Sequence, residues 1–544
     1  MSDVKSHDLT RRDWFLIGVL IALVLPLRLW LLFNTEVAAR DSIGYIRYAL
    51  QFERAPWNEV LKRNDQHPGY PTAIWLMSLP VRSLEGATTP ENMVLSTQLV
   101  SFSAALILVG LMYLLGRQFF DRTVSFGAAI LYQCLPISAH HLSDGISEPF
   151  YLVLLVSGLL HMVIAIRTRS IASSALCGAF AALAYLTRPE GLLIVPAFGI
   201  ALLATQFRTE WRASWGRTFV CGLGMVLASL LFVSVYVYAT ERITNKPSAM
   251  DSLRNLWKWL ISLATSGATQ AGLHGSAHLF AASYPASDSN AIRLKCSLWA
   301  LLAEICQGFH YVATVPALLG CWGSFATLRR HAGFWALALY GVLHSFILVA
   351  LAMSVHYVSD RHVMILVMGG CYFVVFGLRE LPRRVLAWHK AETPNPAVLP
   401  WYRSASMWFA ILLLALIGVS LPKATQRLHA HRVGNHQAGL WLADHLQIGD
   451  VIEDDHNWSH FYAGLLFEEG REPVLPVDHE SICYVVTTRS RDVDIDAKRQ
   501  TAKIAPDARI VFVWPPHSDA ATARVIVYAQ RRSFKTHPWR VAPP

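Results

Sequence analysis

Residues 140–169, HHLSDGISEPFYLVLLVSGLLHMVIAIRTR, contain the pattern that decides the fold. Residues 149–166 carry no Asp, Glu, Lys or Arg, whereas Glu148 precedes this stretch and Arg167 follows it. An apolar helix of about 17–25 residues is long enough to cross the hydrocarbon core of a bilayer. We therefore predict that residues 149–166 form a membrane-spanning helix.

The same pattern recurs along most of the chain. Hydrophobic residues make up 54% of the 544 residues and charged residues only 15%, too few polar groups for a soluble surface of this size. A mainly α, polytopic helical membrane bundle of about eleven spans, at most thirteen, is the predicted fold. The spans are expected at residues 14–33, 92–116, 123–139, 149–166, 171–187, 190–206, 217–239, 306–327, 332–354, 362–378 and 405–421.

Every second connection between these spans is rich in Lys and Arg, and these connections form the basic set. The connections between them form the other set, which includes residues 140–148, without Lys or Arg, and two short turns with one arginine each. This asymmetry predicts a cytoplasmic N-terminus in a multi-pass protein of a bacterial inner or plasma membrane. The apolar segment 70–82 is short and bounded by prolines, so we expect it at the interface or as a re-entrant segment. The basic set contains Arg11, Arg12, Arg117, Arg122, Arg167, Arg169, Arg208, Arg212, Arg217, Arg329, Arg330, Arg379, Arg383, Arg384 and Lys390.

Charge and cysteine content exclude several other classes. The formal charge of +10 arises largely from topology-setting loops, so it predicts no nucleic-acid partner. The eight cysteines form no CxxC pair, which argues against a disulfide framework or structural zinc. The first apolar run continues to Phe33 without a small-residue cleavage site, so we expect an uncleaved first span.

Three longer segments are predicted on the extracytoplasmic side. In a transmembrane domain of residues 1–421, the outer loop 34–91 contains DSIGYIRYALQFE, which predicts a helix on the membrane surface. The outer loop 240–297 contains SLRNLWKWLISL, whose Trp and Lys residues favour the headgroup level. Residues 422–544 are expected to form a small α/β domain, with QAGLWLADHL helical and ICYVVTT, ARIVFVW and VIVYA as strands.

Candidate site residues gather in these outer connections. Asp41 begins the first outer helix, with Tyr45 one turn later, and serves either as a helix cap or as a general base. His67, in a turn fixed by two prolines, either marks the interface or meets a phosphate. Asp144 or Ser147 is expected to cap the helix that starts at Pro149.

Ionisable residues at the ends of spans provide further candidates. Glu148 lies where a span enters the membrane, a costly place for a carboxylate without a partner or a cavity. A metal site built from His140, His141 and the nearby acids is a weaker alternative. Arg188 pairs either with Glu190 or with a phosphate, because a guanidinium binds phosphate through two donors. Arg361, followed by His362, either pairs with Asp360 on the surface or turns inward to an anion.

Taken in order, these motifs resemble the GT-C superfamily of membrane glycosyltransferases. The closer likeness is to the branch with protein O-mannosyltransferases and lipid A aminoarabinose transferases, and it covers residues 14–378. No P-loop, GxSxG, HExxH or dinucleotide-binding motif is present. The likeness rests on Asp41-x-x-x-Tyr45, His67-Pro-x-x-Pro, Ser147-Glu148-Pro, Leu186-Thr-Arg188-Pro-Glu-Gly and Ser359-Asp-Arg361-His.

The resemblance implies an inverting transfer of a sugar from a polyprenyl-phosphate carrier to an acceptor at the outer face. It implies Asp41 as the base and Glu148, or its rival Asp144, as the second acid. It also implies that His67, Arg361 and Arg188 hold the lipid phosphate, and that Tyr45, Glu190 and His362 belong to the substrate site. Two positions depart from the family pattern: Ser42 follows Asp41 where many relatives have glutamate, and His67 stands where some have lysine.

The predicted function is therefore a polyprenyl-phosphate-sugar-dependent glycosyltransferase with no cofactor and no divalent metal. Its expected partners are the lipid-linked donor, membrane lipids and an acceptor that is a protein, a lipid or a polysaccharide. A transporter or lipid flippase is the alternative, since such proteins place ionisable groups within their spans. His161 and His344 are the main mid-span polar residues here, and no internal repeat is visible.

Overall fold

The chain folds into two compact units. The structure is a computed structural model, and it describes residues 9–245, 290–355, 357–391, 404–447, 449–454, 457–465, 482–489 and 504–531. Unit 1 comprises Met1–Leu32, Arg54–Ala73 and Leu99–Gln426. Unit 2 comprises Phe33–Glu53, Ile74–Gln98 and Arg427–Pro544. The domain boundary predicted at residue 421 stays a prediction.

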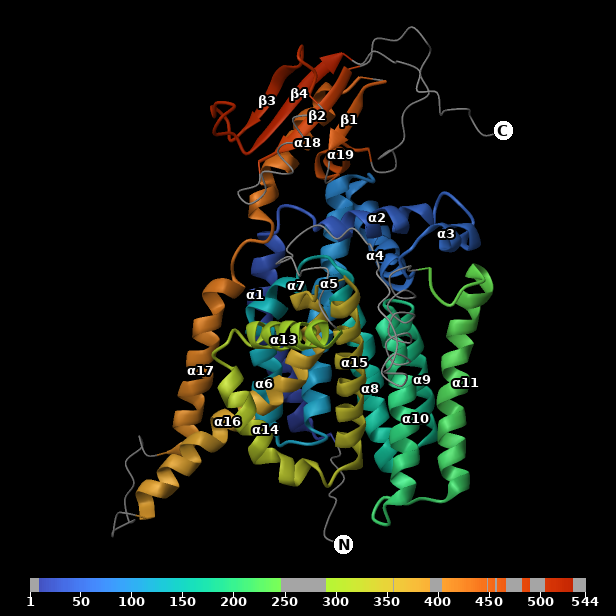
Figure 1. Ribbon diagram of the computed structural model, residues 1–544, viewed down its shortest axis with the longest axis vertical. Helices are drawn as coiled ribbons and strands as arrows, with labels where there is room; N and C mark the ends of the chain where they lie inside the picture. Colours follow the sequence, from blue (N-terminus) through green and yellow to red (C-terminus); the bar gives the residue numbers. More distant parts are fainter. Residues whose placement is uncertain are drawn as a thin grey trace. The chain divides into compact units, whose positions relative to one another are not determined.

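Unit 1 is a bundle of long helices, with α13 lying across them (Figure 1). Short 3-10 turns η1 (Pro189–Leu193) and η2 (Thr205–Phe207) flank α10, and η3 (Asp360–Val363) precedes α16. The helices α4 (Gly69–Glu85) and α5 (Pro90–Gly116) contribute to both units. The other helices of unit 1 are α1 (Arg11–Phe33), α3 (Trp57–Arg63), α6 (Arg122–Cys134), α7 (Pro136–His141), α8 (Ser147–Thr168), α9 (Ile171–Tyr185), α10 (Ile194–Ala204), α11 (Trp215–Thr240), α13 (Asn290–Gly308), α14 (Thr314–Leu328), α15 (Ala332–Val355), α16 (Met364–Ala391) and α17 (Ala405–Ala424).

Eight helical segments in the described parts of the chain are long and apolar enough to cross a membrane. They contain α1, α5, α8, α10, α11, α15, α16 and α17, which confirms the predicted membrane bundle. The spans predicted at residues 123–139, 171–187 and 306–327 correspond to shorter helices: α6 with 13 residues, and α9 and α14 with 15 each. The count of eleven, and the interfacial place of segment 70–82 within α4, stay predictions.

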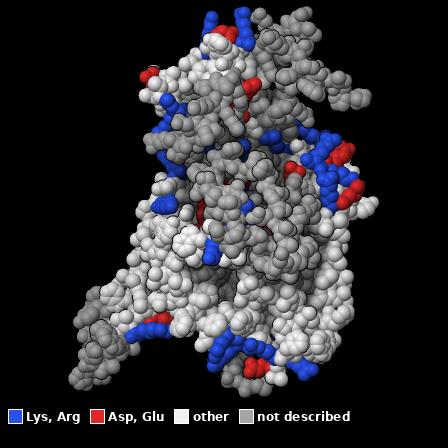
Figure 2. All heavy atoms as spheres, in the orientation of Figure 1, with Lys and Arg blue, Asp and Glu red and all other residues white. Residues whose placement is uncertain are grey.

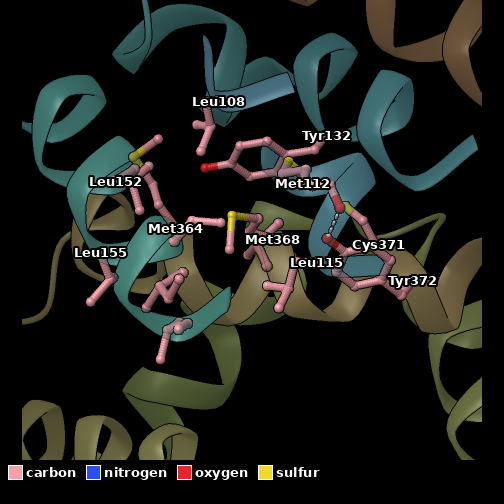
Figure 3. Close-up of a cluster of buried hydrophobic side chains, with 14 of the residues drawn as sticks. Leu108, Met112, Leu115, Tyr132, Leu152, Leu155, Met364, Met368, Cys371 and Tyr372 are labelled. Carbon is pink, nitrogen blue, oxygen red and sulfur yellow. Dashed lines mark hydrogen bonds between the residues drawn. The ribbon is translucent and has the colours of Figure 1, made fainter. Parts of the chain in front are cut away.

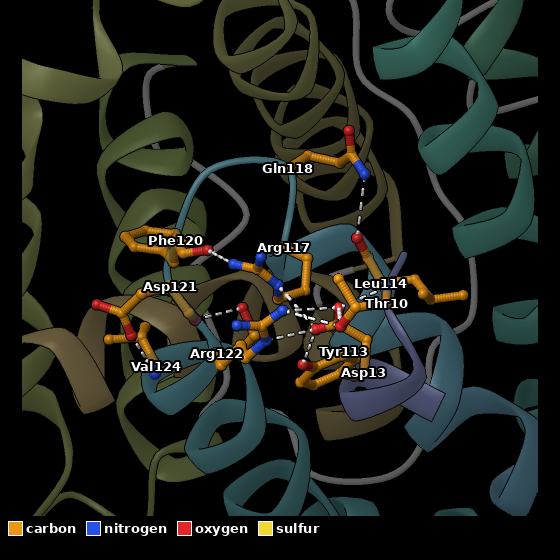
Figure 4. A network of polar contacts seen from close by, with 11 residues as sticks. Thr10, Asp13, Tyr113, Leu114, Arg117, Gln118, Phe120, Asp121, Arg122 and Val124 are labelled. Atoms are coloured by element: carbon orange, nitrogen blue, oxygen red, sulfur yellow. Dashed lines mark hydrogen bonds and ion pairs between the residues drawn. The ribbon is translucent and has the colours of Figure 1, made fainter. Parts of the chain in front are cut away.

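A buried carboxylate ties three elements together at one end of unit 1 (Figure 4). Asp13, in the first turn of α1, is 1% exposed and accepts hydrogen bonds from Tyr113 Oη at 2.7 Å and Arg122 Nε at 2.9 Å. Its other oxygen accepts from the backbone N and hydroxyl of Thr10. Because the carboxylate is paired and fully hydrogen-bonded, its burial is tolerated, and it joins α1 to α5 and α6.

Basic connections of the predicted cytoplasmic set contact one another. Arg169 donates to Thr205 and to the carbonyl of Trp211, and Arg217 donates back to the carbonyl of Arg169. Lys and Arg gather along the lower edge of this unit, as Figure 2 shows. These basic connections therefore lie at one end of the bundle. The orientation of the bundle in the membrane stays a prediction.

Arg28 is a buried cation near the C-terminal end of α1. Its guanidinium is 1% exposed and donates to Gln133 Oε1, to the carbonyl of Ala139 and to Ser143 Oγ, each within 3.1 Å. These neutral acceptors satisfy its donors and tie α1 to α6, α7 and the connection that follows.

Close backbone contacts and a dense core hold the remaining helices. Gly377 of α16 faces the carbonyl of Pro316 in α14, and Gly178 of α9 faces that of Met225 in α11; a Cβ at either glycine would overlap that carbonyl. Such small residues let transmembrane helices approach closely. Figure 3 shows the core between α5, α6, α8 and α16, where Tyr372 Oη donates to the carbonyl of Met112 at 2.6 Å.

Unit 2 contains a four-stranded sheet of order β1-β2-β4-β3. Strand β1 (Val451–Asp454) pairs parallel with β2 (Ile482–Thr488), while β4 (Val525–Arg531) pairs antiparallel with β2 and with β3 (Arg509–Trp514). Helix α18 (Val433–His445) packs on the sheet through Ala438 and Leu442. The helix and three strands predicted here are confirmed; β1 was missed because it has only four residues. The unit also holds α2 (Arg40–Gln51), η5 (Ala430–Arg432) and α19 (Trp458–Tyr462).

One prediction about a helix start is wrong. Helix α8 begins at Ser147 with Ile146 at its N-cap and no side-chain cap, so neither Asp144 nor Ser147 caps it. Helix α2 has Ala39 as its N-cap, which leaves Asp41 in the first turn, where the helix dipole favours a carboxylate. The SLRNLWKWLISL segment lies outside the described residues.

Adding one methyl group at Gly377 or Gly178 should destabilise unit 1. Each Gly→Ala substitution forces two helix backbones apart, and overpacking of this kind costs about 1–3 kcal/mol. Thermal unfolding of the purified protein, followed by tryptophan fluorescence, measures the effect. Gly199→Ala in α10 and Gly341→Ala in α15 are the controls, because nothing lies within 4 Å of a Cβ at either position. Equal melting temperatures for both pairs of variants would contradict this account of the packing.

Candidate functional site

A buried carboxylate lies at the start of α8, in unit 1. Glu148 is 3% exposed and follows a short connection in which Gly145 adopts a positive φ of 65°. That backbone conformation suits glycine and lets the chain turn from α7 into α8. The turn places the carboxylate at the first residues of an apolar helix, where it requires a positively charged partner.

Arg188 supplies that partner from the turn after α9. Its backbone is extended, with φ at −149°, and Pro189 follows at the first position of η1. Arg188 Nη1 donates to Glu148 Oε1, and Arg188 Nε lies 3.6 Å from Glu190 Oε2. The guanidinium also lies over the ring of Tyr151, 5.7 Å from its centre. Arg188 thus contacts Glu148 as well as Glu190, which goes beyond the local pair considered from the sequence.

The turn η3 brings a second arginine to the same oxygen. Arg361 Nε lies 3.8 Å from Glu148 Oε1, and the Arg361 side chain is 35% exposed. Ser359 and His362 form a capping box, in which His362 Nδ1 accepts from the Ser359 backbone N–H. His344 Nε2 of α15 bonds to the His362 carbonyl at 3.1 Å, so η3 is held from α15 as well.

The Asp360 side chain pairs with His141, so the alternative in which it pairs with Arg361 is not the one observed. Its Oδ2 bonds to His141 Nε2 at 3.1 Å, and its Oδ1 accepts from Ser359 Oγ and from the Arg361 backbone N–H. This bond links α7 to η3. Asp360 is therefore a positioning residue that orients the turn from which Arg361 reaches Glu148.

Side chains from the start of α8, from η1 and from η3 line one cavity in unit 1. Its wall combines two carboxylates, two guanidinium groups and two imidazoles with apolar side chains from α8, α15 and α16. An anion with apolar neighbours, such as the headgroup of a lipid phosphate, matches this mixture of cationic and apolar groups. The lining residues are Glu148, Tyr151, Leu152, Arg188, Glu190, His344, Leu348, Arg361, His362, Met364 and Ile365.

Five predicted site residues meet in this cavity, namely Glu148, Arg188, Glu190, Arg361 and His362. Asp144 lies outside the lining but close enough to act electrostatically on His141. Asp41 and Tyr45 belong to unit 2, on α2; Asp41 is exposed and Tyr45 half-buried.

His67 has different surroundings from those expected of a phosphate ligand. It is 2% exposed, stacks on Tyr236 at 5.4 Å between ring centres and meets the edge of Tyr185 at 5.0 Å. Its Nε2 bonds to Thr244 Oγ1 at 2.9 Å. Since His67 does not line the cavity that holds the two arginines, its role in phosphate binding stays a prediction.

The contributions of His141, His344 and Tyr151 to this part of unit 1 were not predicted from the sequence. His141 appeared only as half of a His-His pair, yet the two rings diverge: His140 Nε2 bonds to the Lys423 carbonyl at 2.8 Å. Among the described residues, no three His, Cys, Asp or Glu side chains gather as a metal site would require. The polar position of His344 within a span was the available signal, since mid-span polar groups are costly and usually have partners.

The bond between His141 and Asp360 should make stability depend on pH. Burial alone would lower the pKa of His141, but the hydrogen bond to Asp360 and the charges of Asp360, Glu148 and Asp144 raise it above its ordinary value of 6.5. A raised folded-state pKa stabilises the protein below the unfolded-state pKa, and this contribution disappears as pH rises through the folded-state pKa. His141→Gln should therefore lower the melting temperature most near pH 5.5 and least near pH 9.

Asp360→Asn is the matched variant for this test. It should give the same pH profile, and the double variant should add little to either single change, because both remove one interaction. A loss of stability that is the same at every pH would contradict an ion pair between His141 and Asp360.

Comparisons with known proteins agree with this architecture. The model of the family "Dolichyl-phosphate-mannose-protein mannosyltransferase" matches residues 67–240, a range that includes Glu148 and Arg188. No curated protein matches the sequence.

Two solved structures of ArnT show a similar fold. ArnT from Cupriavidus metallidurans bound to undecaprenyl phosphate aligns with a TM-score of 0.57 and 12% identity over 96% of this chain and 98% of that one. Its apo structure aligns with a TM-score of 0.54 and 13% identity over 94% and 97%. The oligosaccharyltransferase AglB from Archaeoglobus fulgidus, in complex with an inhibitory peptide and a dolichol-phosphate, aligns with a TM-score of 0.47 and 12% identity. That alignment covers 84% of this chain but only 64% of AglB. The chain therefore has a membrane fold similar to that of ArnT, and its residues 67–240 match the mannosyltransferase family.

Proposed function

We propose that this protein transfers a sugar from a polyprenyl-phosphate carrier to an acceptor at the outer face of the membrane, with inversion of the anomeric centre. The observation that carries the proposal is the convergence of Arg188 and Arg361 on one buried position at the end of a membrane bundle. The carrier class is supported by the ArnT structure, which was solved with undecaprenyl phosphate bound.

The two arginines match the charge that develops on the leaving group. When the bond between the sugar C1 and the phosphate oxygen breaks, the electron pair stays on phosphate and adds a negative charge. Guanidinium groups already fixed near that oxygen stabilise the charge without reorganising, which lowers the barrier to transfer. Arg188 is held by Glu148, Glu190 and the ring of Tyr151, and the turn carrying Arg361 is held by Asp360.

Asp41 is assigned the role of general base. The acceptor hydroxyl or amine loses its proton as its oxygen or nitrogen bonds to C1, and a carboxylate accepts that proton. Single displacement on the face opposite the phosphate inverts the anomeric centre. The support for Asp41 is its place in the first turn of an outer helix, its exposed carboxylate and its match to the first-loop aspartate of the family.

The transporter hypothesis gains nothing from the mid-span histidines. His161 stacks on Phe180, 5.8 Å between ring centres, and His344 bonds to a backbone carbonyl of η3. His161 is thus packed against an aromatic ring, and His344 belongs to the lining of the cavity that holds Arg188 and Arg361.

Transfer assays with a panel of radiolabelled sugars on polyprenyl phosphate test the proposal. Purified protein in nanodiscs is incubated with each donor and with lipid, polysaccharide and Ser/Thr-rich peptide acceptors. Asp41→Asn should lower transfer by about 100-fold or more, because the acceptor loses its base. Arg188→Gln and Arg361→Gln should each lower it by about 100-fold, because the leaving phosphate loses a cation.

Glu59→Gln and Arg63→Gln, both on the exposed helix α3, are the matched controls and should retain transfer. Each variant's melting temperature separates lost chemistry from lost folding. Undiminished turnover by Asp41→Asn would remove Asp41 from the role of base. Absence of transfer from every donor by the wild-type protein would argue against the whole proposal.

A further inference from the structure

We propose that Glu148 competes with the carrier phosphate for Arg188 and Arg361, so that it is displaced when phosphate binds and helps to expel polyprenyl phosphate after transfer. The inference rests on the proposed function and assigns to Glu148 a role in product release.

Arg188 and Arg361 both lie close to the same carboxylate oxygen of Glu148. Arg188 Nη1 donates to Glu148 Oε1, and Arg361 Nε lies 3.8 Å from that atom. The second oxygen, Oε2, is 3.4 Å from Ser147 Oγ. A single anionic oxygen between two guanidinium groups is the position that a phosphate oxygen would take in the loaded site. Glu148 thus fills this position from within the protein.

The net charge of the cavity indicates that the phosphate replaces Glu148 at the two arginines and does not bind beside it. Its lining contains two carboxylates, Glu148 and Glu190, and two guanidinium groups, so these formal charges cancel when the lining histidines are neutral. A phosphodiester would bring one further negative charge into a site whose cations are already engaged. A buried charge without compensation is strongly unfavourable, so the phosphate gains the arginines only if Glu148 releases them.

A neighbouring imidazole can receive the displaced carboxylate. The charge of Glu148 acts on His141, and together with Asp360 and Asp144 it raises the pKa of this ring despite its burial. His141 already bonds to Asp360 through Nε2. A protonated His141 therefore provides a third cation near Glu148, one that the phosphate does not occupy.

The competition matters most after transfer. Polyprenyl phosphate is a monoester and carries more negative charge than the diester donor, so two arginines alone would hold the product more tightly than the substrate. Glu148 offers these arginines an alternative partner of fixed position, which favours departure of the product. Neutralising Glu148 should consequently strengthen product binding.

Binding of undecaprenyl phosphate to the full-length protein in nanodiscs tests this inference without any need for transfer activity. In Glu148→Gln the charged carboxylate no longer competes for the two arginines. The variant should therefore bind undecaprenyl phosphate about 10- to 100-fold more tightly than the wild type. Arg188→Gln and Arg361→Gln should weaken binding. Glu59→Gln, in α3 and outside the cavity lining, is the control and should bind like the wild type.

Thermal shifts keep the test valid if Glu148→Gln is unstable. That variant leaves two arginines without their carboxylate, so it should melt below the wild type when empty and show the larger upward shift when undecaprenyl phosphate is added. Unchanged or weaker binding by Glu148→Gln, alongside weaker binding by the arginine variants, would overturn the competition and leave the proposed function intact. Unchanged binding by both arginine variants would instead overturn the phosphate site and the proposed function with it.

Discussion

The pairing of one buried carboxylate with two arginines organises the functional end of the helix bundle. Glu148 stands at the start of α8, while Arg188 follows α9 and Arg361 belongs to η3. Removing one member of a buried ion pair costs about 3–5 kcal/mol, so these three elements hold one another in place. The supporting contacts, from His141 to Asp360 and from His344 to the His362 carbonyl, fix the turn that carries Arg361.

Much of this arrangement was predictable because the bilayer limits what an apolar chain can do. Long uncharged runs have to be helices, since no water is present to satisfy their backbone groups. The alternation of basic connections assigned residues 140–148, Arg188 and Arg361 to the same end of the bundle, and Glu148 contacts both arginines there. The β-rich runs at residues 482–488, 508–514 and 525–529 predicted three strands, and the structure has a strand in each.

The contacts that failed to emerge from the sequence depend on side-chain geometry. Asp360 and Arg361 are neighbours in sequence, yet their side chains diverge, so that one meets His141 and the other Glu148. A phosphate-binding role for His67 was inferred from the chemistry of its imidazole. Its surroundings depend on packing instead, because two tyrosine rings enclose it. The burial of Arg28 could not be predicted from its apolar sequence neighbours, because its acceptors come from a distant helix and from a backbone carbonyl.

The buried guanidinium of Arg28 constrains the order in which the chain assembles during synthesis. Its acceptors on Gln133, Ala139 and Ser143 lie 105, 111 and 115 residues further along the chain. The ribosome has not yet made them when the first helix reaches the lipid. An arginine in mid-membrane carries an insertion penalty of about 2.5–3.5 kcal/mol, which a long side chain near a helix end reduces by reaching towards the headgroups. The first helix to be translated therefore acquires its final depth and rotation only after α6 and α7 have emerged.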